Sequence, residues 1–140
     1  SEYVSELPDR LLSGFRDQAA RETSPMCQMV LFHIGGAIGE RLPDDGAVGN
    51  RNATYVMIMA AAWRPDDPDG KRHIAWARGA WEALRPYSCG GHYINFETVD
   101  EGEDRTRAAY GQNYARLAEC KARYDPDNLL RVNRNIARTA

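Results

Sequence analysis

Two apolar runs in the first half of the chain predict two strands. Residues 27–34 form an apolar run that begins after Pro25 and stops at a pair of glycines. Residues 53–63 are apolar at both odd and even positions. Short apolar runs bounded by proline and glycine are typical of strands that are buried on both faces. Between the two runs, residues 41–52 are rich in Gly, Asp, Pro and Asn, which predicts a long loop.

Helical spacing of apolar residues predicts helices at residues 1–24 and 71–84. In the first helix Pro8 suits a position in the first turn, and Pro86 follows the second helix, where proline prevents continuation. The apolar stripe of the first helix consists of Leu11, Leu12, Phe15 and Ala19. The stripe of the second helix consists of Ile74, Ala77, Trp81 and Leu84. Both stripes repeat every three or four residues, so each helix is expected to bury one face.

The second half of the chain predicts a short strand and a longer helix. Two glycines precede a strand at residues 92–98, and a helix is expected at residues 105–123 with Gly111 as its weak point. Asp125 and Pro126 block its continuation. The predicted element order is αββαβα, which indicates an α+β fold with a small, mainly antiparallel sheet and helices packed on one face. Because three strands make a small sheet, we expect neighbouring strands from another chain or segment.

Composition and charge exclude several classes of protein. The chain has 140 residues, which suits a single domain spanning residues 1–140. The net charge of −2 gives no electrostatic reason for binding nucleic acid or an anionic membrane. The longest apolar run is too short for a bilayer, and no basic and apolar leader opens the sequence. We therefore expect a cytoplasmic protein whose three cysteines are reduced thiols.

Metal and nucleophile sites have weak support in the sequence. The three histidines and three cysteines do not fall at metal-ligand spacings, so no metal is predicted, and His33 is expected to be a core residue. Cys89 and His92 are close enough in sequence for a thiol hydrolase. That chemistry needs a geometry that sequence does not reveal, and a turn before a strand is the plainer interpretation.

Tyr93, Asn95 and Arg51 are the candidate polar site residues. On a strand, Tyr93 and Asn95 would share one face. A phenol and a carboxamide side by side can hydrogen-bond the edge of a planar polar ligand, and the phenol can also transfer a proton. The same pattern fits a half-exposed edge strand with one polar face, and both interpretations remain open. Arg51, in a Gly-rich loop, could bind a carboxylate or belong to a solvated loop.

Three C-terminal motifs resemble a known family. They read Tyr-Ile-Asn-Phe at 93–96, Tyr-Gly-Gln-Asn-Tyr-Ala-Arg-Leu at 110–117 and Lys-Ala-Arg-Tyr-Asp-Pro-Asp-Asn at 121–128. In this order they resemble the C-terminal segment of berberine-bridge-enzyme-like flavin oxidases, and weaker upstream similarities extend the resemblance over about residues 27–136. The resemblance implies part of a substrate domain at about residues 1–104, with a berberine-like segment that returns to the flavin at about residues 88–140.

The resemblance also implies a function. Members of the family oxidise an alcohol or amine by hydride transfer to FAD, so the expected partners are an FAD-binding domain or subunit and a small-molecule substrate. Tyr93 would be catalytic and, with Arg51, would bind substrate. Asn95 would lie near the flavin, while Asn128 and Asn133 would help to dock the tail on the FAD-binding domain. The chain alone is expected to be inactive because the flavin carries the redox step.

Two departures from the family pattern limit these roles. Phe96 stands where several relatives carry a tyrosine that can act as base, so the base must be Tyr93 or a residue elsewhere. Gly49-Asn50-Arg51 stands where relatives often show Pro-His-Arg, so an imidazole is missing. The alternative function is a stand-alone, non-catalytic binding or dimerisation module that kept the fold, because uncovered strand edges favour self-association.

Overall fold

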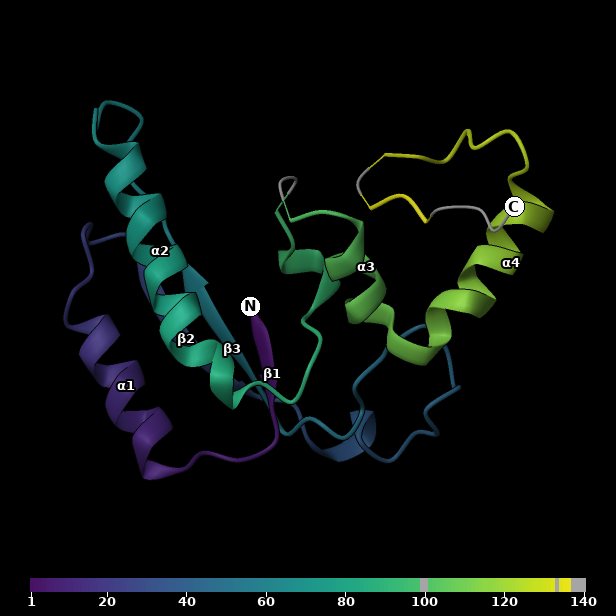
Figure 1. Cartoon of the computed structure of the whole chain (residues 1–140), viewed down its shortest axis with the longest axis horizontal. Coiled ribbons are helices and arrows are strands. Elements are labelled where there is room, and N and C mark those ends of the chain that lie inside the picture. Colours follow the sequence, from purple (N-terminus) through teal and green to yellow (C-terminus); the bar gives the residue numbers. More distant parts are fainter. Residues whose placement is uncertain (99–100, 133, 137–140) are drawn as a thin grey trace.

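A three-stranded antiparallel sheet forms the centre of the computed structural model, which describes residues 1–98, 101–132 and 134–136. Strand β3 (Tyr55–Ala60) lies between β1 (Glu2–Val4) and β2 (Gln28–His33) (Figure 1). Tyr3 opposes Val56, and Val30 opposes Ile58. The two strands predicted at residues 27–34 and 53–63 are therefore confirmed, and so is the predicted fold class.

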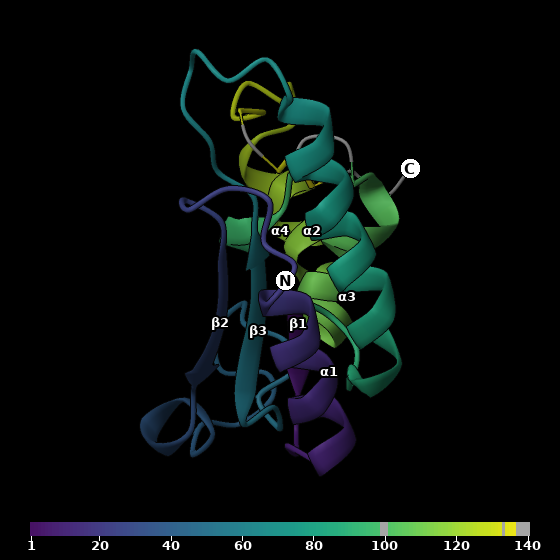
Figure 2. The same ribbon diagram turned by 90° about the vertical axis from the view of Figure 1, so that its left-hand side faces the viewer.

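Helices α1 (Asp9–Ala19) and α2 (Gly70–Leu84) pack on the same side of the sheet (Figure 2). The core between these layers contains Val4, Leu11, Met57 and Leu84, each at most 1% exposed. Met57 alternates with Val56 along β3, which packs instead with Tyr3 in a second, smaller cluster. The helical face of the sheet thus carries the main core.

The buried stripe of α2 is rotated relative to the predicted one. It consists of His73, Trp76, Ala80 and Leu84, whereas Ile74 is 41% exposed. A polar residue can face inward here because both ring nitrogens of His73 are satisfied. Thr23 Oγ1 lies 2.7 Å from Nδ1, and Asp67 Oδ2 lies 3.1 Å from Nε2. Hydrophobicity alone could not reveal these two partners.

The first residues form a strand and not the predicted helix. Pro8 is the N-cap of α1, with an extended backbone at ψ 151°, so the helix begins at Asp9. A proline at this position disfavours helical dihedrals in the residue before it. The freed segment Glu2–Val4 pairs with β3 along its whole length. Long-range pairing therefore outweighs the helical pattern at residues 1–7.

Residues 92–98 also differ from the prediction, because they turn away from the sheet. The chain follows the outer edge of β1 only as far as Gly91: Cys89 N donates to Tyr3 O at 2.9 Å, and Tyr3 N donates to Gly91 O at 3.3 Å. Gly90 and Gly91 then adopt φ values of 94° and 71°, which favour glycine. A 3₁₀ turn at Ile94–Phe96 follows. The predicted strand at residues 92–98 is thus wrong.

Gly91 occupies a crowded position, and its replacement is expected to destabilise the fold. A Cβ at this position would lie 2.0 Å from Asn50 Nδ2 and 2.8 Å from Ala108 O. Overpacking costs about 1–3 kcal/mol, and a left-handed backbone adds about 1–2 kcal/mol for a residue with a Cβ. Urea unfolding of Gly91→Ala should show this loss. Gly79→Ala is the control, since its Cβ would meet nothing within 4 Å in α2. Equal stability of the two variants would contradict the close approach.

The predicted helix at residues 105–123 is two helices, α3 (Glu103–Tyr110) and α4 (Tyr114–Tyr124). The break falls at Gly111, where φ is 53°, and a 3₁₀ turn at Gly111–Asn113 joins the two. The long loop between β2 and β3 runs beneath these helices, beside the sheet (Figure 1). The weak point predicted at Gly111 is confirmed as a complete interruption.

Strand β2 is more exposed than predicted. It lies at the edge of the sheet. Phe32 is 51% exposed, and Gln28 and His33 are also exposed, although His33 packs edge-on against Tyr55 with ring centroids 5.3 Å apart. The predictions that this strand is buried on both faces and that His33 is a core residue are therefore wrong.

Every helix in the described part of the chain is too short or too polar to cross a membrane.

A buried carboxylate, Glu2, joins the sheet to helices α2 and α3. Its side chain is 3% exposed. Trp81 Nε1 donates to Oε1 at 2.7 Å, Ser88 Oγ donates to Oε2 at 2.6 Å, and Arg105 Nη1 donates to Oε1 at 2.8 Å. The four residues come from β1, α2, the following turn and α3. Because a buried charge is tolerated only with such partners, this cluster fixes α3 against the sheet.

Candidate functional site

Tyr93 and Asn95 lie together at the surface, but on a turn and not on a strand. Asn95 Nδ2 donates to Tyr93 Oη at 2.7 Å. The ring of Tyr93 contacts Phe96 edge-on, with centroids 5.0 Å apart and an interplanar angle of 74°. A 3₁₀ turn brings residues three apart onto one side, which explains why Tyr93 and Phe96 meet. We call residues 93–96 the 93–96 turn.

The 93–96 turn is bracketed by a buried polar pair. His92 Nε2 lies 3.0 Å from Glu97 Oε2, and both side chains are almost fully buried. Thr106 Oγ1, on α3, donates to Glu97 Oε1 at 2.8 Å. Arg134 reaches the same carboxylate, with Nε 3.6 Å from Oε1, and its Nη2 donates to the Glu97 carbonyl oxygen. The exposed turn is therefore supported by a cluster of polar side chains, which we call the Glu97 cluster: His92, Glu97, Thr106 and Arg134.

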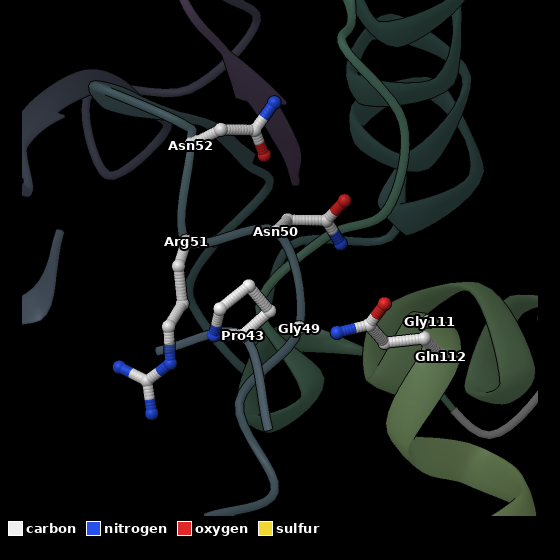
Figure 3. Close-up of a pocket in the computed structure, with 7 residues that line it drawn as sticks. All are labelled: Pro43, Gly49, Asn50, Arg51, Asn52, Gly111 and Gln112. Atoms are coloured by element: carbon white, nitrogen blue, oxygen red, sulfur yellow. The ribbon is translucent and has the colours of Figure 1, made fainter. Parts of the chain in front are cut away.

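A cleft of about 290 Å³ lies between the β2–β3 loop and the 3₁₀ turn that precedes α4 (Figure 3). Asn50 and Gln112 present their amides from its two sides, whereas the side chain of Arg51 extends along another side past Pro43. Asn50 Nδ2 donates to Ala108 O at 3.4 Å. The lining residues are Pro43, Gly49, Asn50, Arg51, Asn52, Gly111 and Gln112. Four of the seven lining residues carry polar side chains, and the cleft connects the loop to the turn between α3 and α4.

Arg51 contacts its own loop. Its Nη1 donates to Ile38 O at 3.1 Å, its Nη2 donates to Asp45 O, and its Nε is buried without a hydrogen-bond partner among the described residues. The guanidinium therefore closes the β2–β3 loop. The structure does not bring Arg51 into contact with Tyr93 through any described interaction, and its predicted substrate-binding role stays a prediction.

The same loop is held from outside through its backbone. Asn113 Nδ2 donates to Pro43 O at 2.9 Å and to Val48 O at 3.2 Å. Arg116 Nη1 donates to Asp44 O at 2.8 Å, and its Nη2 donates to Gly46 O. Each of these acceptors is a main-chain carbonyl. Helix α4 and the turn before it therefore fix the path of the loop.

Asn128 lies in a capped turn beyond α4. Its φ is 53°, and its N–H donates to Asp125 O at 3.0 Å. Its Oδ1 is buried and has no hydrogen-bond partner among the described residues. Asp125 accepts the amides of Leu129 and Leu130 at 2.7 and 3.0 Å, and its ion pair with Lys121 lowers the pKa of the carboxyl. Asn133, the other predicted docking residue, lies outside the described residues.

Neither a hydrolase nor a metal site gains support from the geometry. Burial raises the pKa of the Cys89 thiol, whereas an activated cysteine needs a lowered pKa. The His92 Nε2 that could act as its base is engaged by Glu97. No group of three His, Cys, Asp or Glu residues in the described part of the chain is placed to hold a metal ion.

Comparison with known proteins identifies the segment that contains the 93–96 turn and the Glu97 cluster. Residues 92–137 match the family model described as "Berberine and berberine like". This chain carries a berberine-like segment. An FAD-linked oxidoreductase of Dictyostelium discoideum is 31% identical over 86% of this chain and 26% of its own length. Monolignol oxidoreductase AtBBE-like 13 of Arabidopsis thaliana is 25% identical over 97% of this chain and 28% of its own length. The predicted family resemblance is confirmed.

Solved structures give the same result for the fold that holds the berberine-like segment. Wild-type BBE-like 1 of Physcomitrella patens matches 99% of this chain with a TM-score of 0.86 at 22% identity. GilR, an oxidoreductase that catalyzes the terminal step of gilvocarcin biosynthesis, matches 91% of this chain with a TM-score of 0.75 at 28% identity. The chain spans 30% of each of these structures and about a quarter of the length of the curated relatives described above.

The sequence pattern did not predict the Glu97 cluster within the berberine-like segment. The sequence pattern places Glu97 in the predicted strand at residues 92–98 and indicates no role for Thr106 or Arg134. A buried carboxylate leaves no apolar periodicity for a sequence pattern to detect. A usable signal was the pair His92 and Glu97 on either side of an aromatic turn, together with an arginine in the tail.

Protonation of His92 is expected to make stability depend on pH. Burial lowers the pKa of His92 below 6.5, Arg105 lowers it further, and Glu97 and Glu101 oppose these effects. The unfolded chain therefore binds a proton more readily, and the free energy of unfolding should fall as the pH drops below about 6.5, by at most about 1.4 kcal/mol per pH unit. Urea unfolding across this range measures the slope. His92→Gln should flatten it, and the exposed His33→Gln should not. An unchanged slope in His92→Gln would contradict the assignment.

Proposed function

We propose that this chain is the C-terminal, substrate-domain portion of an FAD-dependent oxidoreductase that oxidises an alcohol or amine. The observation that carries the proposal is the surface pair Tyr93 and Asn95, held 2.7 Å apart within the berberine-like segment. Relatives named FAD-linked oxidoreductases match most of this chain, which supports the redox chemistry. The partner would be an FAD-binding domain or subunit, and the chain alone would be inactive.

The residues of this chain fit one wall of a flavin site. Asn95 and Tyr93 are exposed, and the amide and phenol offer both donors and acceptors to a planar polar edge. Asn128 keeps a buried oxygen without a partner among the described residues, as a docking residue with an absent neighbour would. Asn133 is proposed as a second docking residue. Most donors needed for the FAD phosphates would come from the partner, because the chain shows no glycine-rich phosphate loop.

When bound, FAD supplies the acceptor for the hydride that leaves the substrate carbon. The task left to this chain is to remove the proton from the substrate oxygen or nitrogen. Because Asn95 donates to Tyr93 Oη, the phenol O–H is left to point elsewhere, and the oxygen keeps a fixed position. To accept the substrate proton, Tyr93 must first release its own phenolic proton to solvent, to which it is exposed, and the Asn95 hydrogen bond then holds the phenolate oxygen in place. Phe96 packs against its ring and cannot replace it as base.

A chimaera tests the proposal. In it, this chain replaces the matching segment of the Dictyostelium discoideum oxidoreductase, which is 31% identical to it. We expect the chimaera to be yellow, to show a flavin absorbance spectrum and to oxidise the substrate of its parent. The isolated chain, the control, should be colourless and should bind added FAD weakly or not at all. A folded chimaera without flavin would sink the proposal, and a yellow isolated chain would contradict the need for a partner.

A stand-alone binding or dimerisation module is the second candidate. Four large side chains near the end of the described chain are at least 75% exposed: Tyr124, Leu129, Leu130 and Val132. The edge strand β2 also exposes Phe32. Apolar surface of this kind favours association. Sedimentation of the isolated chain distinguishes the candidates: a stable dimer would favour the module, whereas a monomer that acquires flavin only in the chimaera would favour the enzyme portion.

A further inference from the structure

One buried carboxylate holds three separate parts of the chain. Glu97 Oε2 contacts His92 Nε2 at 3.0 Å, and Oε1 accepts a hydrogen bond from Thr106 Oγ1 at 2.8 Å. Arg134 approaches Oε1 with its Nε at 3.6 Å and also donates from Nη2 to the Glu97 carbonyl oxygen. The segment before the 93–96 turn, helix α3 and the end of the described chain therefore meet at a single side chain. We call residues 134–136 the tail.

The charge of this carboxylate needs a partner. The Glu97 side chain is 2% exposed, and a buried carboxylate is costly unless a positive group and hydrogen bonds compensate it. His92 is a poor source of positive charge, because its burial and the nearby Arg105 favour the neutral ring. Arg134, whose side chain is 19% exposed, is the cation that the structure places on Glu97. Docking of the tail therefore supplies the compensating charge.

Glu97 also contacts the residue that precedes the 93–96 turn. His92 and Glu97 stand on either side of the turn, and their hydrogen bond closes it at its base. The Asn95 to Tyr93 hydrogen bond of 2.7 Å forms within this closed segment. If Glu97 moved toward solvent, where water could compensate its charge, its hydrogen bond with His92 would break and the turn would no longer be closed. The Asn95–Tyr93 pair would then lose its support.

We propose that Glu97 is a positioning residue that couples docking of the tail to the geometry of the 93–96 turn. Arg134 in place keeps Glu97 buried, and Glu97 in place keeps Tyr93 and Asn95 together. Such coupling is reciprocal, so a change at either end must be felt at the other. The proposal concerns contacts within this chain and goes beyond the proposed function, since it holds whether or not a flavin is bound.

Nuclear magnetic resonance of the isolated, isotope-labelled chain tests the coupling through two readouts. One is the backbone order parameter at residues 134–136, and the other is the chemical shift of the Asn95 side-chain amide. In Arg134→Ala we expect the order parameter to fall from about 0.85 to below about 0.6. The Asn95 signals should move toward those of a free asparagine side chain. Glu97→Gln should produce both changes, and Arg134→Lys, which keeps the charge, should restore part of each.

Arg131→Ala is the matched control, because it removes an exposed cation three residues before Arg134. Both readouts should stay as in the unaltered chain. If Arg134→Ala loosens the tail while the Asn95 signals stay in place, the coupling is refuted and Arg134 only attaches the tail. If Glu97→Gln fails to fold, Arg134→Ala and Thr106→Val, which removes one hydrogen bond from Glu97, decide the question by the same two readouts. Unchanged signals in both of these variants would also refute it.

Discussion

Tyr93→Phe in the FAD-loaded chimaera is expected to lower kcat by about 10²- to 10⁴-fold. The substitution removes the phenolic oxygen that is proposed to exchange a proton with substrate and leaves the ring packed against Phe96. Asn95 loses an acceptor but stays at the surface, so folding and flavin content should change little. Steady-state kinetics, with flavin absorbance to count active sites, measures the effect.

Controls separate the proposed chemistry of Tyr93 from general damage. Tyr124→Phe removes a phenol that is 75% exposed at the end of α4 and should leave kcat unchanged. Asn95→Ala keeps the phenol but frees its oxygen, so we expect a smaller loss than in Tyr93→Phe. If Tyr93→Phe retains full turnover at normal flavin content, the base lies elsewhere and the assignment of Tyr93 fails.

Replacement of Glu2 by alanine is expected to reduce the free energy of unfolding by about 3–5 kcal/mol, the usual cost of removing one partner from a buried ion pair. Arg105 would lose its contact at 2.8 Å and keep Glu101 at 3.1 Å. The indole N–H of Trp81 and the hydroxyl of Ser88 would lose their acceptor. Because β1, α2 and α3 meet at this carboxylate, the loss should appear in the global transition measured by urea unfolding.

An exposed ion pair provides the comparison for Glu2. Asp17→Ala breaks the contact with Arg16 at 2.9 Å, where both side chains are more than half exposed. Exposed pairs contribute about 0–1 kcal/mol. Glu2→Gln, which keeps the shape and one acceptor, should fall between the two variants. If Glu2→Ala lowers the free energy of unfolding no more than Asp17→Ala does, the contacts of Glu2 do not stabilise the fold.

Local patterns predicted the elements whose own residues carry a clear apolar pattern. Helix α2 was expected at residues 71–84 and occupies Gly70–Leu84, and the central strand was expected at residues 53–63 and occupies Tyr55–Ala60. The missed elements depend on distant contacts. Strand β1 forms because residues 2–4 pair with residues 55–57. The strand expected at residues 92–98 is replaced by a turn because Gly90 and Gly91 redirect the chain.

The candidate site was also predicted only in part from the sequence. The spacing of Tyr93 and Asn95 indicated that their side chains could act together, and a hydrogen bond joins them, although a turn and not a strand brings them close. Glu97 and Arg134 are 37 residues apart in sequence, and no periodic pattern links them. A sequence shows which side chains can do chemistry. It does not show which buried charge will be compensated by which distant arginine.

The way in which the β2–β3 loop is fixed has a consequence for protein engineering. Asn113 and Arg116 hold this loop by the carbonyls of residues 43, 44, 46 and 48, and Arg51 binds the carbonyls of residues 38 and 45. Every amino acid carries such a carbonyl. The side chains at positions 44 and 47 can therefore be randomised while the loop keeps its path, so a library at these positions could vary the surface of the loop without rebuilding the scaffold.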